Sequence, residues 1–203
     1  MNLNIFEWND ENSHHIIKIL SQTLMKLIQY LLILSIFIIQ FSCKKEITKD
    51  PIINGFGKVF ELADQDFNYD VSADFKAVFD VGYSPKENNK SNASIETGAR
   101  FLNMHAQSGM SKKQLHVALV IHGAAAKDIL TDAAYKERYG IKNPNLELIN
   151  ALIDADVQII LCGQTASHRK IKKTEMINGV QLSLSAMTAL VQLQNEDYRL
   201  IKF

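Results

Sequence analysis

Two residues that could do chemistry stand at the ends of apolar, strand-like stretches. Cys162 ends the run VQIILC, and His122 follows the run LHVALVI. A thiol at the start of a helix faces partial positive charge, which favours the nucleophilic thiolate. If the two strands are parallel neighbours, the imidazole and the thiol lie on one rim of the sheet and can share a proton. We therefore assign Cys162 and His122 as candidate catalytic residues.

The residues that follow each strand end suit ligand binding. Gly123 and Gly163 permit sharp turns or the close approach of a ligand. Gln164 comes next, and Arg169 lies among further cationic side chains of the stretch SHRK. We assign Gly123, Gly163, Gln164 and Arg169 to substrate binding.

Each candidate also has a purely structural interpretation. Unpaired cysteines are among the most often buried residues, so Cys162 can simply fill core. His122 can be held by a loop carbonyl, and we expect His105 and His116 at the surface or at an interface. No histidine or cysteine pair has metal-ligand spacing, so we expect neither a metal nor another cofactor. Four charged residues are expected on a solvated helix face: Asp128, Asp132, Glu137 and Arg138.

Composition indicates one globular domain. The 203 residues include 22 Lys or Arg against 22 Asp or Glu, and 47% are hydrophobic. Because there is no basic surplus, DNA and RNA are not expected partners.

The elements that must position the candidate residues alternate between strands and helices. We expect strands at Phe75 to Val81, Leu115 to Ile121, 157–163, 180–182 and 198–203, with a short edge strand at 58–62. Helices are expected at 94–109, capped by Ser94, at 124–130 and 132–140, from Asn143 onward, at 165–171 and at 185–197. Such alternation implies crossover connections, a mostly parallel sheet and helices on both faces, a three-layer α/β sandwich.

The amino-terminal region has another character. Residues 25–42 combine Lys26 with an apolar run and end at Ser42, and they resemble a bacterial lipoprotein signal. The resemblance implies that Cys43 carries the lipid; an uncleaved membrane anchor is the alternative. We expect residues 1–24 to be a non-native or disordered extension, 43–70 a tether, and 71–203 the folded domain. The protein is then exported and attached to a membrane, facing the periplasm or the cell exterior.

Three stretches together resemble the DsrE/DsrF-like (YchN-like) family: LVIHGAAAKDIL, NPNLELINALIDADVQIILCGQTASHRK and SLSAMTALVQLQNEDYRLIKF. The resemblance covers roughly Phe75 to Phe203. It implies a three-layer, flavodoxin-like topology and homo-oligomers, often trimers or hexamers. Cys162 matches the family's cysteine position and His122 its strand-end histidine. In the sulfur-relay members, a cysteine takes up sulfur as a persulfide and passes it to a partner protein with a thiol.

Two hypotheses about function remain. The first is a membrane-tethered sulfur carrier that uses Cys162. The second is a non-catalytic oligomeric binding or scaffold module of the same fold.

Overall fold

The computed structural model describes residues 18–30, 50–62 and 64–202. The chain divides into two compact units, residues 1–46 and 47–203. In the first unit, residues 18–30 form a helix with exposed side chains. Most of the expected signal region, including Cys43, lies outside the described residues, so cleavage and lipid attachment stay predictions. No helix in the described part is long and apolar enough to cross a membrane.

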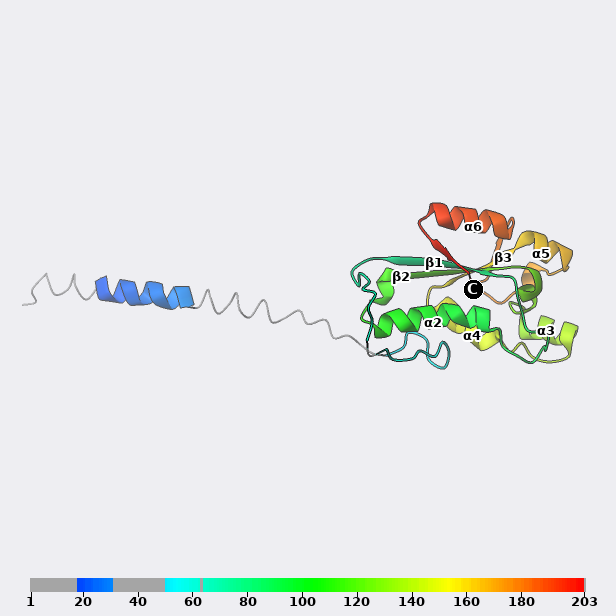
Figure 1. The fold of residues 1–203 in the computed structure, drawn as a ribbon, viewed down its shortest axis with the longest axis horizontal. Coiled ribbons are helices and arrows are strands. Elements are labelled where there is room, and N and C mark those ends of the chain that lie inside the picture. The colour runs from blue at the N-terminus through cyan, green and yellow to red at the C-terminus, as the bar shows by residue number, and fades with distance from the viewer. Residues whose placement is uncertain (1–17, 31–49, 63, 203) are drawn as a thin grey trace, which may run out of the picture. The chain divides into compact units, whose positions relative to one another are not determined.

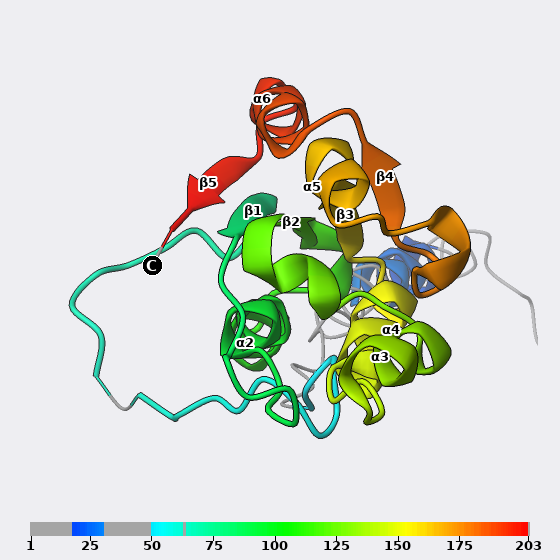
Figure 2. The same ribbon diagram turned by 90° about the vertical axis from the view of Figure 1, so that its right-hand side faces the viewer.

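Within residues 64–202, five parallel strands form one sheet in the order β4-β3-β2-β1-β5 (Figure 2). The strands are β1 (Phe75–Val81), β2 (Leu115–Ile121), β3 (Gln158–Cys162), β4 (Gln181–Ser183) and β5 (Arg199–Ile201). The central strands are apolar over almost their whole length because helices cover both faces. The expected strands β1 and β2 are confirmed from their first to their last residue.

Helices lie on both faces of this sheet (Figure 1 and Figure 2). One layer contains α2 (Ala93–Gln107), α3 (Asp132–Tyr139) and α4 (Leu146–Asp154), and the other contains α5 (Gly163–His168) and α6 (Ala186–Asn195). Short 3-10 helices follow the same chain order: η1 (Lys112–Gln114), η2 (Gly123–Lys127) and η3 (Lys173–Glu175). The expected three-layer α/β sandwich is therefore confirmed.

The strand order differs from a flavodoxin-like one, which is 2-1-3-4-5. Here β1 to β4 follow one another across the sheet, and β5 returns to the free side of β1. The return connection contains α6, on the opposite face from α2 and α4. A right-handed crossover on that face carries the chain back in the reverse direction.

Alternation along the strands separates two apolar clusters. Phe79, Leu119 and Leu161 belong to the larger one, with α2 and α4. Val78, Val120 and Ile160 belong to the smaller one, with Ala189 and Leu193 of α6 and with Tyr198. Because side chains alternate between faces, Asp80, His122 and Cys162 continue the smaller cluster toward the carboxyl ends of the strands.

Three helices, α2, α4 and α5, begin at different residues from those expected. α5 begins at Gly163, directly after β3, and not at residue 165. α4 begins at Leu146 after the N-cap Asn145, and not at Asn143. The Asn143 side chain instead donates to two backbone carbonyls of the preceding loop, at 2.8 and 2.6 Å. α2 is capped by Asn92, and not by Ser94, because the Asn92 side chain accepts the Ser94 N–H at 2.9 Å.

The segment 43–70, expected as a tether, includes residues that pack on the domain. Ile53 is 3% exposed and belongs to the larger apolar cluster. Its N–H donates to Asn103 Oδ1 at 2.8 Å, and its carbonyl accepts from Asn103 Nδ2 at 2.9 Å. These two hydrogen bonds fasten the chain to α2 well before residue 71. Residues 58–62 are irregular rather than the expected edge strand, since they pair with no other strand.

Candidate functional site

The ends of β2 and β3 bring the two candidate catalytic residues to neighbouring positions. Ile121 and Leu161 are partners in the parallel register, so His122 and Cys162 follow directly on adjacent strands. Both lie on the face of the sheet that carries α6. Beyond them the chain diverges, because the connection from β2 leads to α3 and α4 on one face and that from β3 to α5 on the other. In open α/β sheets, ligands bind at such points of divergence.

Hydrogen-bond donors surround the sulfur of Cys162. Burial opposes ionisation of this residue, which is 5% exposed, but the donors outweigh burial and lower the pKa of the thiol from its ordinary value. The donors are the Thr165 hydroxyl and the backbone N–H groups of Thr165, Ala186 and Gln164. They come from the first turns of both α5 and α6. The sequence predicts that a helix amino terminus favours the thiolate, and these four donors are the groups that lower the pKa.

Gly163 allows this arrangement through its lack of a side chain. A Cβ at this position would lie 2.4 Å from the Ser183 carbonyl oxygen and 3.0 Å from that of Leu184. The segment between β4 and α6 therefore passes directly against the start of α5. This close approach brings the Ala186 N–H to the sulfur.

A short chain of hydrogen bonds joins the two strand ends. The Gly123 N–H donates to Thr165 Oγ1 at 3.3 Å, and the same hydroxyl donates to the Cys162 sulfur. Gly123 has φ +55°, a left-handed conformation that glycine adopts without strain. Thr165 is thus a positioning residue that sequence reasoning missed, since nothing in its local pattern indicates a contact with residue 123.

The imidazole of His122 is engaged with β1. Its Nε2 lies 2.6 Å from Asp80 Oδ1, and Lys202 Nζ lies 3.5 Å from the other oxygen of that carboxylate. The ring packs over Gly82, where an added Cβ would come within 2.6 Å of the ring. The hydrogen bond of the ring is therefore made to a carboxylate, and neither to the thiol nor to a loop carbonyl.

A family model describes the sequence pattern of this region. The model of the DsrE/DsrF-like family matches residues 76–203, a stretch that includes His122 and Cys162. The chain belongs to the DsrE/DsrF-like family.

Two solved structures are similar to the DsrE/DsrF-like domain. One is the protein of unknown function MTH1491 from Methanobacterium thermoautotrophicum, with 15% identity, a TM-score of 0.49, and coverage of 64% of this chain and 100% of that chain. The other is the ychN protein from E. coli, with 18% identity, a TM-score of 0.42, and coverage of 64% and 99%. A search among curated proteins found no match.

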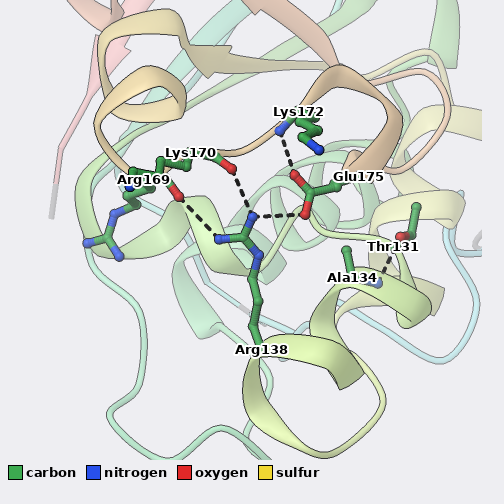
Figure 3. Close-up of polar contacts among 7 residues, drawn as sticks. All are labelled: Thr131, Ala134, Arg138, Arg169, Lys170, Lys172 and Glu175. Atoms are coloured by element: carbon green, nitrogen blue, oxygen red, sulfur yellow. Dashed lines mark hydrogen bonds and ion pairs between the residues drawn. The ribbon is translucent and has the colours of Figure 1, made fainter.

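The remaining predicted site residues of this DsrE/DsrF-like domain lie on or next to α5. Gln164 is exposed, and its Nε2 donates to the Leu184 carbonyl at 3.4 Å. Arg169 is the C-cap of α5, and its side chain points away from the ion pair of Arg138 and Glu175 (Figure 3). The structure therefore places Gln164 beside the Cys162 site and Arg169 at the far end of the helix.

Arg138 holds that far end of α5 (Figure 3). Its guanidinium donates to the carbonyls of Arg169 at 3.1 Å and Lys170 at 3.0 Å, and to Glu175 Oε1 at 2.8 Å. The carbonyls at the end of a helix carry partial negative charge, so the cation both caps and fixes α5. Arg138 is thus not on the purely solvated face expected from the sequence.

Asp128 was also expected to be solvated, and this prediction is wrong. The residue is 0% exposed, and its carboxylate accepts hydrogen bonds from Ser84 Oγ at 2.9 Å, Asn92 Nδ2 at 2.7 Å and Asn145 Nδ2 at 3.2 Å. Burial raises the pKa of Asp128, and the hydrogen bonds from Asn92 and Ser84 lower it only in part. Because Asn92 and Asn145 are the N-caps of α2 and α4, this carboxylate joins the starts of two helices.

Two other predictions concern histidines and metals. His105 and His116 are partly buried, and the His105 ring packs against Phe101 with 4.2 Å between centroids. His105 also borders a cavity of about 550 Å³ at the start of β1, at the opposite end of the sheet from Cys162. In the described residues, no group of three or more His, Cys, Asp or Glu side chains is placed to hold a metal ion.

Proposed function

We propose that this protein carries sulfur as a persulfide on Cys162. The observation that supports the proposal most is the set of four donors around one sulfur atom, drawn from the amino termini of two helices. Such donors stabilise a negative charge on sulfur, which both the thiolate and the persulfide anion require.

The proposed reaction balances without an added oxidant. The Cys162 thiolate attacks a sulfur atom of a polysulfide, a new S–S bond forms, and the S–S bond of the donor breaks. The shortened polysulfide leaves with the electron pair. In the second step, an acceptor thiolate attacks the outer sulfur of the persulfide, and Cys162 leaves as a thiolate. Cys162 is the free cysteine of the described residues, so within them no second thiol can trap the persulfide as a disulfide.

Export and membrane attachment through Cys43 belong to the same proposal, as does a homo-oligomer, a trimer or a hexamer. They rest on the sequence pattern of residues 25–43 and on the family resemblance. Mass analysis of the protein recovered from membranes tests attachment, because lipidated Cys43 adds a diacylglyceryl group. A soluble product that still begins before residue 25 would contradict it.

The deciding experiment for the carrier is intact-mass analysis after exposure to polysulfide. In the Cys43→Ser variant, where Cys162 is the one thiol, we expect one added sulfur atom, removable by a reducing thiol. The matched control adds Cys162→Ser to the same variant and should take up none. Sulfur uptake by this double variant would overturn the proposal.

The second candidate, a binding module without covalent chemistry, is favoured by the 5% exposure of Cys162. Alkylation of the folded protein separates the two. In a carrier, Cys162 reacts with iodoacetamide at pH values below the free-thiol pKa of about 8.5. A module with a buried cysteine reacts only on unfolding.

A further inference from the structure

The outer face of α6 and the residues just before it form an uncharged surface. Three large apolar side chains are exposed there, between 58% and 75%, and we call them the α6 surface: Leu184, Met187 and Val191. The stretch from Gln181 to Asn195 contains no Asp, Glu, Lys or Arg. On a solvated helix, charged residues normally occupy the outer face. Depletion of charge and enrichment in methionine are marks of the centre of a protein interface.

The α6 surface adjoins Cys162. Ala186, at the first position of α6, donates its N–H to the sulfur, and Leu184 lies two residues before it. The Leu184 carbonyl accepts from Gln164, and it lies against Gly163. A protein bound to the α6 surface would therefore cover the approach to the thiol.

α5 lies next to α6 (Figure 2), and basic residues are concentrated at the end of α5 and in the segment after it. We call the exposed basic residues there the α5 cations: Arg169, Lys170, Lys172 and Lys173. From residue 163 to 195, Glu175 is the sole acidic residue. Its carboxylate is already paired with Arg138 at 2.8 Å (Figure 3). The charge of the α5 cations is thus not neutralised within this part of the chain.

We infer that the α6 surface binds an acidic protein that presents its own thiol next to Cys162. The inference rests on the proposed function, since the sulfur of Cys162 has to pass to another thiol. Apolar contacts to the α6 surface supply binding area, and carboxylates of the partner meet the α5 cations. Because Cys162 is only 5% exposed, the partner's thiol has to project from a loop or chain terminus.

A second copy of this chain suits the same surface less well. Two copies related by a two-fold axis present identical patches to each other. The α5 cations of both copies would then enter one interface, where like charges repel.

The test measures mixed-disulfide exchange on the full chain with Cys43→Ser, so that Cys162 is the one thiol. The probes are two peptides, Asp-Leu-Cys-Leu-Asp and Lys-Leu-Cys-Leu-Lys, each joined through its cysteine to thionitrobenzoate. The Cys162 thiolate attacks the peptide sulfur, the peptide disulfide forms on Cys162, and coloured thionitrobenzoate leaves with the electron pair. Rates with β-mercaptoethanol correct for the intrinsic reactivity of each peptide.

We expect the corrected rate to be about tenfold higher for the acidic peptide at low salt, and the preference to shrink as salt is added. Arg169→Glu combined with Lys173→Glu should remove it. The matched control, Lys58→Glu with Lys113→Glu, makes the same change of net charge at other exposed positions and should retain it. Met187→Ser with Val191→Ser should slow exchange with both peptides.

Equal corrected rates for the two peptides would overturn the inference. So would a fall in oligomer mass, by sedimentation velocity, in the Met187→Ser, Val191→Ser variant, because a second copy would then cover the surface. Exchange requires only a reactive thiol. A failed polysulfide experiment would therefore reject the carrier while leaving the peptide preference measurable.

Discussion

Two buried acidic groups lie at paired helix starts in opposite layers of the molecule, and they behave differently. Asp128 lies between the starts of α2 and α4, and Cys162 lies at the starts of α5 and α6. Side-chain amides of N-cap asparagines bind Asp128, whereas backbone amides bind Cys162 directly. Burial raises the pKa of Asp128, while at Cys162 the donors overcome burial and lower the pKa.

The difference teaches that hydrogen-bond number alone does not decide ionisation. Asp128 has no exposed surface, and two of its partner side chains also make other hydrogen bonds: Asn92 donates to the Tyr83 carbonyl, and Asn145 accepts the Asn92 N–H. No buried side-chain nitrogen or oxygen among the described residues lacks a hydrogen-bond partner. Asp128 therefore acts as a structural joint, while Cys162 keeps an acidic thiol at the rim of the sheet.

The largest expected effect is a loss of stability when the Asp128 carboxylate is removed. Asp128→Ala removes the acceptor of three side-chain donors and leaves them buried without it. We expect a loss of about 3 kcal/mol or more in the free energy of unfolding, measured by urea denaturation. Asp154→Ala, at an exposed position of α4, is the control and should change stability by less than about 0.5 kcal/mol. Equal losses in both variants would show that the network contributes little.

Asp128 also predicts a pH dependence with a defined sign. Its folded pKa is raised above the unfolded value, so it stabilises the fold fully below the unfolded pKa, and this contribution is lost as pH rises through the folded pKa. Asp128→Asn cannot titrate. The free energy of unfolding of the natural protein minus that of Asp128→Asn should therefore increase as pH falls from roughly 7 toward 4. A difference that is constant with pH would contradict the raised pKa.

An effect of intermediate size is expected on the pKa of the Cys162 thiol. Thr165→Val removes the hydroxyl donor to the Cys162 sulfur, so the pKa of the thiol should rise by about one unit. The pH dependence of iodoacetamide reaction measures this shift. Thr165→Ser, which keeps the hydroxyl, should leave the midpoint near the natural value. If Val and Ser behave alike, the hydroxyl does not set the acidity of Cys162.

The smallest effect is expected at His122. Because its Nε2 bonds to Asp80, the His122→Gln variant should shift the alkylation midpoint of Cys162 by less than about 0.3 unit. A shift as large as that of Thr165→Val would support proton sharing between His122 and Cys162, as the sequence suggests.

Sequence reasoning located the main elements because their signals are local. β1 and β2 are continuous apolar runs, and Cys162 follows from its place at a strand end. The start of α4 was misplaced because Asn143 and Asn145 are both good caps, and only tertiary contacts choose between them. Contacts over long sequence distances also stayed hidden.

The hidden contacts include the central ones of the site. Ala186 lies 24 residues from Cys162, and Asn92 lies 36 residues from Asp128. No periodicity reports such contacts. The sequence shows Cys162, Gly163 and Thr165 at the end of a strand. It does not show that the Ala186 N–H also reaches the Cys162 sulfur, because that contact depends on how β4 lies beside β3.

That return has an evolutionary consequence. A side chain at Gly163 would push the Ser183 carbonyl away and carry the amide of Ala186 off the sulfur. The acidity of the neighbouring Cys162 thus depends on the lack of a side chain at Gly163. Relatives that keep the cysteine for chemistry should therefore keep this glycine, and lineages that lose the chemistry should be free to lose both.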